Sequence, residues 1–474
     1  MEEQKPKRVL FLDYMRVLAL LMMIQGHTVY DFLDVSIRDG NGIGMMIWTQ
    51  LRGYTAPFFM MVSGAVFAYL LIYQEKSDGS NPRVKAGTRR IITLFFWGYL
   101  LNFPVYAIFK VFTADGWDRF LNIRIGETLI TIFSIAIALY LYRSLHSDDV
   151  ESEQERDFMR RLFQKNKLKN IGVSTRLMNR HFLKSERKKR RFFSSFFYSL
   201  LISIPFLIIS SLLSVQEKIQ ALRVDVLQTI GAGLLFVVLF YVIAKRNHLL
   251  MGIMHFIMMI LCIGIYPLIN NVDLFNLPLF VSPYLNNFDN QAMFPLIPWL
   301  AYIFAGAILG IFIANEVKKP NFEKMIGHQL AFAGLGIIGL SLLGIAFEEF
   351  AYGRTYFWTD SPNLVYHRIG IVLCVGSAMA YLARLTNGLP KFLRQMSRNT
   401  LWLYVGHLII IYKIVKPIIG YQKRFGPVTV LIFVATMYVL MYLQTQIIVY
   451  KNKKGSYGAV LRSLVGLEKS PKAD

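Results

Sequence analysis

Cysteine is nearly absent from this chain: only Cys262 and Cys374 occur among its 474 residues. Both lie within apolar runs and are far apart in the sequence, which argues against a disulfide framework and against a thiolate metal site. No pair of histidines has the spacing of a zinc motif, so we expect no metal. An internal repeat and a low-complexity tract are missing as well.

Charged residues are scarce too, at 17% of the chain, whereas hydrophobic residues make up 55% and the mean hydropathy is +0.43. Soluble domains are about 45 to 50% apolar. Repeated apolar runs of about 20 residues can each cross a hydrocarbon core roughly 30 Å thick. The composition therefore predicts an all-α polytopic membrane helix bundle rather than two or three soluble domains.

The apolar runs predict about twelve transmembrane helices. They lie near residues 9–31, 47–73, 91–112, 124–142, 193–214, 224–244, 249–270, 292–314, 327–347, 366–384, 400–418 and 427–450. The N-terminal stretch is basic and then apolar like a signal peptide, but no small-residue cleavage pattern precedes Asp31. We interpret it as an uncleaved first span.

Lysine and arginine collect in alternate segments between these spans, with 15 of them in residues 143–191. Because such residues remain on the cytoplasmic side, we expect both termini in the cytoplasm and the protein in the cell (cytoplasmic) membrane. The net charge of +23 raises nucleic acid as a partner. Most of this excess lies beside span ends, however, where anionic lipid headgroups are the first contact, so we expect membrane lipids and no nucleic acid.

The first predicted span carries three ionisable residues, Asp13, Arg16 and His27. At 100° per residue they share one stripe of a helix, and about 16 Å separates Arg16 from His27 along its axis. Ionisable groups within spans are rare and are candidates for function. The alternative is an Asp13–Arg16 ion pair at adjacent turns with His27 as a satisfied interfacial residue.

The second predicted span, "RGYTAPFFMMVSGAVF" from Arg52, places another cation in the outer half of the membrane, at the depth of His27. Pro57 should kink this helix and free carbonyl groups. Ser63 supplies a hydroxyl, and Gly64 permits close helix contact. A structural kink with small-residue packing is the alternative interpretation.

These motifs together resemble the opening of the membrane acyltransferase superfamily, which includes acyltransferase-3 enzymes and heparan-alpha-glucosaminide N-acetyltransferase-like proteins. The resemblance is carried by "FLDYMR", the ten residues between Arg16 and His27, and "APFFMMVSG". "VDVLQTIGAGLL" from Val224 and "FPLIPWLAYIFAGAILG" from Phe294 resemble the glucosaminide branch, and "MSRNTLWLYVGHLIIIY" from Met396 resembles the acyltransferase-3 closing signature.

The resemblance implies transfer of an acyl group, usually acetyl, from cytoplasmic acyl-CoA to a hydroxyl or amine of a sugar, glycan or lipid-linked acceptor at the far face. Acyl-CoA is then a donor substrate and no cofactor is bound. His27 corresponds to the essential residue of the site, with Arg16 below it. Where acyltransferase-3 members often carry an Arg-x-x-Arg pair, this chain has adjacent Arg89 and Arg90.

The same resemblance divides the chain. Residues 1–118 hold catalytic spans 1–3, and residues 215–451 hold the remaining membrane spans, followed by a cytoplasmic tail at 452–474. We recognise no counterpart for residues 119–214, which we interpret as an inserted two-span block around a long basic cytoplasmic loop (143–192).

Acyl transfer needs a base or a relay nucleophile and donors aimed at the developing oxyanion. Imidazole suits the first role because its ordinary pKa lies near neutrality. We expect His27 to be base or acyl relay, oriented by Asp13, by Asp225 or by a backbone carbonyl. Arg52 would polarise the thioester carbonyl or hold the acceptor.

Donor phosphates would be bound by Arg16, Arg89 and Arg90, because guanidinium pairs well with phosphate. For Arg89 and Arg90 the alternative is ordinary positive-inside anchoring. Further candidates to line the site are Ser63, Asp225, His367, Tyr404 and His407.

A polytopic transporter or flippase of a glycan or lipid-linked substrate would also carry intramembrane charges and broken helices. Such proteins often contain paired interrupted spans, whereas this sequence has one clear interruption, in the second span, and a lesser one at Pro295 and Pro298. That asymmetry favours an enzyme over a transporter. A third alternative is an inactive scaffold or sensor that keeps the fold, and the intact His27 and Arg16 count against it.

Overall fold

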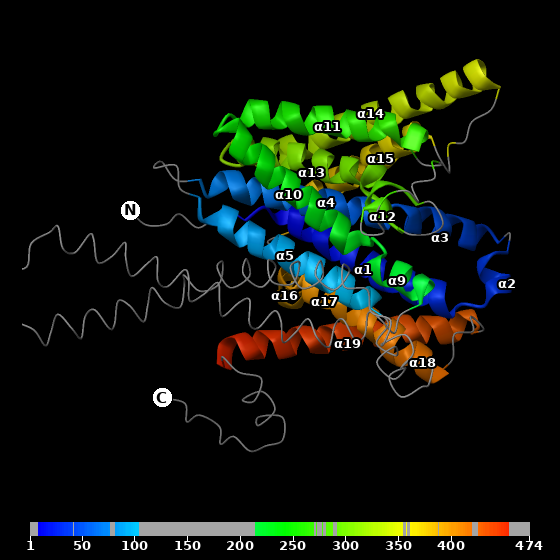
Figure 1. Ribbon diagram of the computed structural model, residues 1–474. Coiled ribbons are helices and arrows are strands. Elements are labelled where there is room, and N and C mark those ends of the chain that lie inside the picture. The colour runs from blue at the N-terminus through cyan, green and yellow to red at the C-terminus, as the bar shows by residue number, and fades with distance from the viewer. Residues whose placement is uncertain are drawn as a thin grey trace, which may run out of the picture. The chain divides into compact units, whose positions relative to one another are not determined.

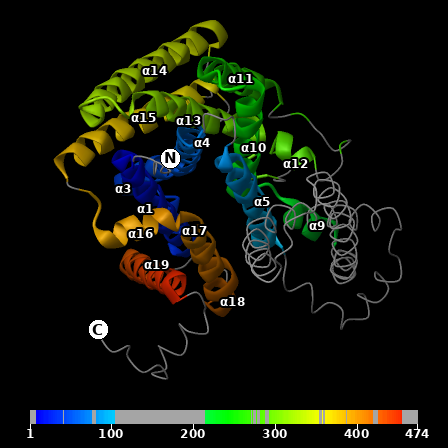
Figure 2. The ribbon, with the colours of Figure 1, turned by 90° about the vertical axis from the view of Figure 1, so that its left-hand side faces the viewer.

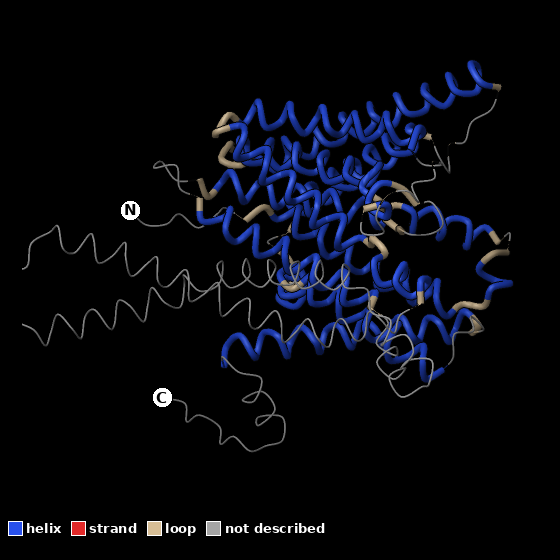
Figure 3. The backbone as a smooth tube through the Cα atoms, in the orientation of Figure 1, coloured by secondary structure: helices blue, strands red, loops and turns tan. Residues whose placement is uncertain are grey.

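A computed structural model describes residues 8–40, 42–75, 81–103, 214–269, 281–287, 292–353, 361–386, 388–419 and 425–454, with residues 272, 277 and 357. Throughout these residues the chain is helical, with two isolated β-bridges and no strand (Figures 1 and 3). Contacts divide the chain into two units. The first comprises Met1–Gly87, Leu94–Leu101 and Val224–Asp474, and the second comprises Thr88–Thr93 and Asn102–Arg223.

The helices follow the apolar runs. The longer ones are α1 (Leu10–Phe32), α3 (Ile43–Gly53), α4 (Thr55–Tyr73), α5 (Pro82–Asn102), α10 (Val226–Ala244), α11 (His248–Ile269), α13 (Leu296–Glu316), α14 (Phe322–Tyr352), α15 (Pro362–Leu385), α17 (Thr400–Leu408) and α19 (Pro427–Lys454). The π-helical segment η3 (Ile409–Val415) continues α17 into α18 (Lys416–Ile419). Shorter helices are α2 (Val35–Arg38), α9 (Val215–Leu222), α12 (Ser282–Leu285) and α16 (Lys391–Arg398).

Among the described residues, nine helical stretches are long and apolar enough to cross a membrane: α1, α3 with α4, α10, α11, α13, α14, α15, α17 to α18, and α19. Nine of the twelve predicted spans are therefore confirmed as apolar helices. The predicted span 91–112 falls partly within α5, whose first half carries four basic residues and which is not among the nine. The predicted span 124–142, and all but the last residue of 193–214, lie outside the described residues.

The predicted kink in the second span is a break between two helices. It falls at Tyr54, between α3 and α4, three residues before Pro57. Pro57 therefore lies in the first turn of α4, where its missing N–H would have had no intrahelical partner. Interrupting the helix before the proline avoids the clash that an uninterrupted helix would impose.

Close backbone contact joins α4 to α13 and confirms the packing predicted for Gly64. A Cβ at Gly64 would lie 2.3 Å from the Ile303 carbonyl oxygen. Across the same seam, a Cβ at Gly306 would lie 2.0 Å from the Met61 carbonyl oxygen, and one at Gly310 would lie 2.2 Å from that of Ala65. Only glycine fits at these positions, as is typical of helix pairs in membranes.

Helix α1 lies in the middle of the first unit. It packs against α3, α4, α15, α16, α17 and α19 (Figure 2). On the side of α17, η3 and α19 the contact is a buried apolar cluster that includes Leu20, Ile24, Leu403, Ile411 and Met441. This cluster fixes η3 beside the C-terminal half of α1.

The helices of the first unit run roughly side by side, so the bundle has two ends. Helix α1 begins, and α19 ends, on the left of Figure 1, whereas α2, α3 and α18 lie on the right. We call the first the Arg16 end and the second the His27 end, after the two residues of α1 that lie toward them.

Candidate active site

At the His27 end, the imidazole of His27 lies against η3. Its Nδ1 is 3.0 Å from the Tyr412 hydroxyl, and the two rings meet edge to face with centroids 5.9 Å apart. His27 is half-buried and lies near the C-terminal end of α1. Single π-helical turns such as η3 occur frequently at functional sites, because the changed register redirects side chains.

A buried ion pair continues from Tyr412. The Tyr412 hydroxyl donates to Asp31 Oδ2 at 2.5 Å, and Lys416 Nζ lies 2.6 Å from Asp31 Oδ1. The Asp31 side chain is 4% exposed and that of Lys416 is 13% exposed. Asp31, Tyr412 and Lys416 were not singled out from the sequence. The available signal was the four-residue step from His27 to Asp31, because residues with this spacing share one face of an α-helix.

Two of the predicted lining residues join this group. The ring of His407 lies 5.5 Å from that of His27, and the ring of Tyr404 lies 5.4 Å from that of His407. His407 is fully buried and its Nδ1 donates to the Leu403 carbonyl oxygen at 3.0 Å. Its Nε2 is therefore an acceptor, and it has no hydrogen-bond partner in the described structure.

Arg52 lies beside the same turn of α1, as the sequence predicted. Its guanidinium stacks over the ring of Tyr30 at 3.8 Å and lies 5.6 Å from that of Trp48. A Cβ added to Gly26, next to His27, would meet the Arg52 side chain at 3.9 Å. A cation and two aromatic rings thus lie next to the imidazole.

Asp225 and His367 have structural partners of their own. Asp225 is the N-cap of α10, where its carboxylate accepts from the Val226 N–H at 2.8 Å. His367 contacts Ser341 at 3.2 Å and the rings of Tyr54 and Phe357. Ser63 is half-buried on α4.

At the Arg16 end, the carboxylate of Asp13 is surrounded by donors. It pairs with Arg8, lies 3.5 Å from Arg16 Nη1, and accepts from Ser397 Oγ at 2.9 Å. The ion pair between Asp13 and Arg16, considered above as an alternative, is therefore present. Fourteen residues of helix, about 21 Å, separate Asp13 from His27, so Asp13 does not orient the imidazole.

Guanidinium groups outnumber carboxylates around Arg16. Besides Arg8, the charge of Arg83 acts on Arg16, and the buried Nε of Arg83 has no hydrogen-bond partner in the described structure. The Arg16 side chain remains 29% exposed. Arg89 and Arg90 belong to the second unit. Asp13 is the one carboxylate that pairs with these first-unit arginines in the described residues, so this end carries excess positive charge.

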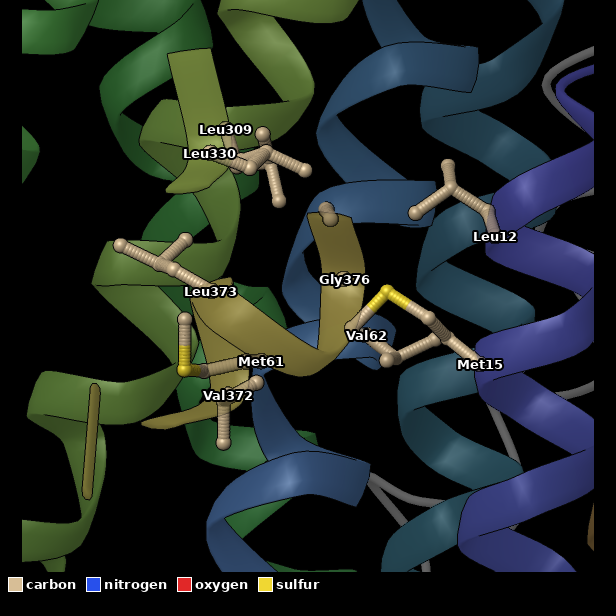
Figure 4. Close-up of a pocket in the computed structure, with 10 residues that line it drawn as sticks. Leu12, Met15, Met61, Val62, Leu309, Leu330, Val372, Leu373 and Gly376 are labelled. Atoms are coloured by element: carbon tan, nitrogen blue, oxygen red, sulfur yellow. The ribbon is translucent and has the colours of Figure 1, made fainter. Parts of the chain in front are cut away.

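A small apolar pocket lies among α1, α4, α13, α14 and α15 (Figure 4). Its lining consists of Leu12, Met15, Met61, Val62, Ala65, Leu309, Leu330, Val372, Leu373 and Gly376. None of these side chains can donate or accept a proton, so the pocket itself offers no chemistry. Among the described residues, no group of three or more His, Cys, Asp or Glu side chains could hold a metal ion.

Comparison with known families shows which family the chain belongs to. The family model described as heparan-alpha-glucosaminide N-acetyltransferase, catalytic, matches residues 8–120 and 129–347, most of the chain. The chain belongs to this family. No curated protein and no solved structure matches it.

The heparan-alpha-glucosaminide N-acetyltransferase match bears on the site in two ways. It includes Arg16, His27 and Arg52, and its second range runs through most of residues 119–214, for which the sequence showed no counterpart. It ends before α15, so Tyr404, His407, Tyr412 and Lys416 lie beyond the matched ranges. The His27 group therefore combines a matched helix with a segment outside the match.

Proposed function

We propose that this protein is a membrane-embedded acyltransferase that moves an acyl group, most simply acetyl, from cytoplasmic acyl-CoA to a hydroxyl or amine of a sugar, glycan or lipid-linked acceptor on the opposite side. The observation that carries the proposal is the layout of α1. One stripe of this helix presents Arg16 near one end and His27 near the other, about 16 Å apart. Each end has a different chemistry, which suits a donor and an acceptor that approach from opposite faces.

The Arg16 end suits the phosphate groups of acyl-CoA. Guanidinium groups bind phosphate through paired, charge-assisted hydrogen bonds. Arg8, Arg16 and Arg83 supply three of them against the single carboxylate of Asp13. Arg89 and Arg90 on α5 are proposed as further donor contacts.

The His27 end suits the transfer step. As the acceptor oxygen or nitrogen attacks the thioester carbonyl carbon, its proton passes to His27. The new C–O or C–N bond forms, the C–S bond breaks, and the CoA thiolate leaves and takes up the proton as a thiol. In the relay version His27 first accepts the acyl group and then passes it on. In this proposal the Arg52 cation stabilises the developing oxyanion, and the Nε2 of His407, which has no hydrogen-bond partner in the described structure, receives a hydrogen bond from the acceptor.

The proposed orientation puts the Arg16 end in the cytoplasm, in the cell membrane. The positive-inside distribution supports it. The start of α1 and the end of α19 lie at the same end of the bundle, as is expected when both are on one side of the membrane (Figure 1). We also propose that the chain is divided as the sequence predicted, into residues 1–118, 119–214, 215–451 and 452–474.

The test is turnover of radiolabelled acetyl-CoA by the purified protein in lipid, with an α-glucosaminide as acceptor probe. We expect CoA release and acceptor labelling by the wild type, and a loss of about 10² to 10⁴-fold in His27→Ala. The matched control is His255→Phe. His255 is likewise a histidine within a membrane helix, but it is fully buried, its Nδ1 donates to the Met251 carbonyl oxygen at 2.7 Å, and its ring lies among those of Phe240 and Phe304.

Equal turnover by wild type and His27→Ala would refute the assignment of His27. Movement of a glycan across liposomes without any CoA release would favour the transporter alternative instead.

A further inference from the structure

Hydrogen-bond donors at the His27 end can be assigned from the distances alone. Asp31 is ionised, because Lys416 Nζ lies 2.6 Å from its Oδ1. An ionised carboxylate only accepts, so the single Tyr412 hydroxyl proton is the one in the 2.5 Å bond to Asp31 Oδ2. The bond of 3.0 Å between Tyr412 and His27 then needs its proton from the other partner, which is His27 Nδ1.

This assignment fixes the tautomer of His27. When Nδ1 of a neutral imidazole carries the proton, Nε2 carries a lone pair. Both versions of the proposed reaction need that lone pair, since a base accepts a proton there and a relay accepts an acyl group there. Positive charge then develops on the ring, and the carboxylate of Asp31 lies one hydroxyl away to stabilise it.

We infer that Asp31 and Tyr412 are positioning residues that hold His27 with its proton on Nδ1 and its reactive lone pair on Nε2. The inference rests on the proposed function and identifies the residues that determine the tautomer of His27 in that site. Lys416 completes the arrangement by occupying Oδ1 and so leaving Oδ2 to the tyrosine. The logic is that of a carboxylate that orients a catalytic imidazole, with a tyrosine hydroxyl placed between the two.

A purely structural role for Asp31 would predict something different. A buried ion pair between α1 and α18 could serve only to join these helices, and then the hydroxyl of Tyr412 would be dispensable. The two roles separate in variants that keep the packing but change the hydrogen bonds. Without an ionised Asp31 the Tyr412 hydroxyl is able to donate to Nδ1, which moves the ring proton to Nε2 and removes the lone pair from the reaction.

The first experiment compares Tyr412→Phe with Tyr438→Phe. Tyr438 donates to the Leu21 carbonyl oxygen of the same helix α1 at 3.1 Å, so both variants lose one tyrosine hydroxyl bonded to α1. We expect Tyr412→Phe to lower kcat for acetyl transfer by about 10²-fold with KM for acetyl-CoA changed less than about twofold, and Tyr438→Phe to retain kcat. Equal kcat in Tyr412→Phe and wild type would overturn the inference.

The second experiment uses the double variant Asp31→Asn with Lys416→Met, which leaves no unpaired charge. We expect its melting temperature to stay near that of the wild type while kcat falls by about 10²-fold or more, since a wrong tautomer is costly in such arrangements. If the double variant kept both the kcat and the melting temperature of the wild type, the inference would be overturned and Asp31 would be only a structural ion-pair partner.

The tautomer itself is measurable without turnover, by ¹⁵N NMR of histidine-labelled protein in lipid nanodiscs, with the His27 signals assigned from His27→Gln. We expect a protonated Nδ1 in the wild type and a protonated Nε2 in the double variant. A protonated Nε2 in the wild type would overturn the inference even if His27→Ala is inactive. Failure of the proposed function is seen separately, as wild-type turnover equal to that of His27→Ala.

Discussion

The two ends of α1 differ in the donors that surround a buried carboxylate. Each contains a buried carboxylate, Asp13 or Asp31, which needs donors because an unpaired charge away from water is costly. Asp13 takes two guanidinium groups and a serine hydroxyl, so the surplus at that end is positive charge. Asp31 takes one ammonium group and one tyrosine hydroxyl, so the charge of this carboxylate is balanced by Lys416 and the group left to react is the imidazole of His27.

The partners of a buried carboxylate therefore determine what its surroundings can bind. Excess guanidinium at the Arg16 end favours an anion, whereas at the His27 end an imidazole beside a balanced ion pair and the single cation of Arg52 favours exchange of a proton. Substitutions at both ends of α1 test this contrast.

Removing one cation should cost far more at the His27 end. Lys416→Met leaves Asp31 buried without a counter-charge and should lower stability by about 3 kcal/mol. Arg8→Met leaves Asp13 with Arg16 and Ser397, and because Arg8 is 35% exposed, the loss should stay within about 1 kcal/mol. Thermal unfolding in detergent measures both. Equal decreases in melting temperature for the two variants would show that Asp13 and Asp31 depend equally on these cations.

Removing the central guanidinium should weaken binding of the donor. Arg16→Gln should raise KM for acetyl-CoA about tenfold or more with little change in kcat, since a phosphate contact is kept from ground state to transition state. The control is Arg398→Gln, an exposed arginine next to Ser397 at the same end. A fall in kcat without a change in KM would move Arg16 from donor binding to the transfer step.

The smallest effect is expected from the serine that links α16 to α1. Ser397→Ala removes one hydrogen bond from Asp13 while both arginines remain, and should lower stability by about 1 kcal/mol with activity unchanged. The melting temperature and the acetyl-CoA turnover check this. A tenfold loss of turnover would mean that the position of Asp13 controls Arg16 more tightly than its ion pairs suggest.

Local periodicity was enough to predict much of α1. The stripe of Asp13, Arg16 and His27, the ion pair at its first turns and the neighbouring Arg52 all follow from a regular helix rotation and from depth in the membrane. Nine spans followed from apolar length in the same way.

Periodicity failed where the backbone changes its register or where partners are remote. Tyr412 lies 385 residues after His27 and is presented by a π-helical segment, whose residues do not keep the α-helical repeat. Asp31 follows His27 by one turn, but a carboxylate at the end of a span is also what an interfacial residue looks like, so its pairing needed the structure. The donors that surround Asp13 include Ser397, which is 384 residues away.

The position where the family match ends has a consequence for exchanging parts between relatives. Residue 347 lies within α14, and everything that α16, η3 and α18 add to α1 comes after it. A chimera joined at that point would combine the first helix of one parent with Ser397, Tyr412 and Lys416 positions of the other. A chimera that takes α1 and residues 397–416 from the same parent keeps each of these side chains with its own partner. We expect such chimeras to fold and to be active.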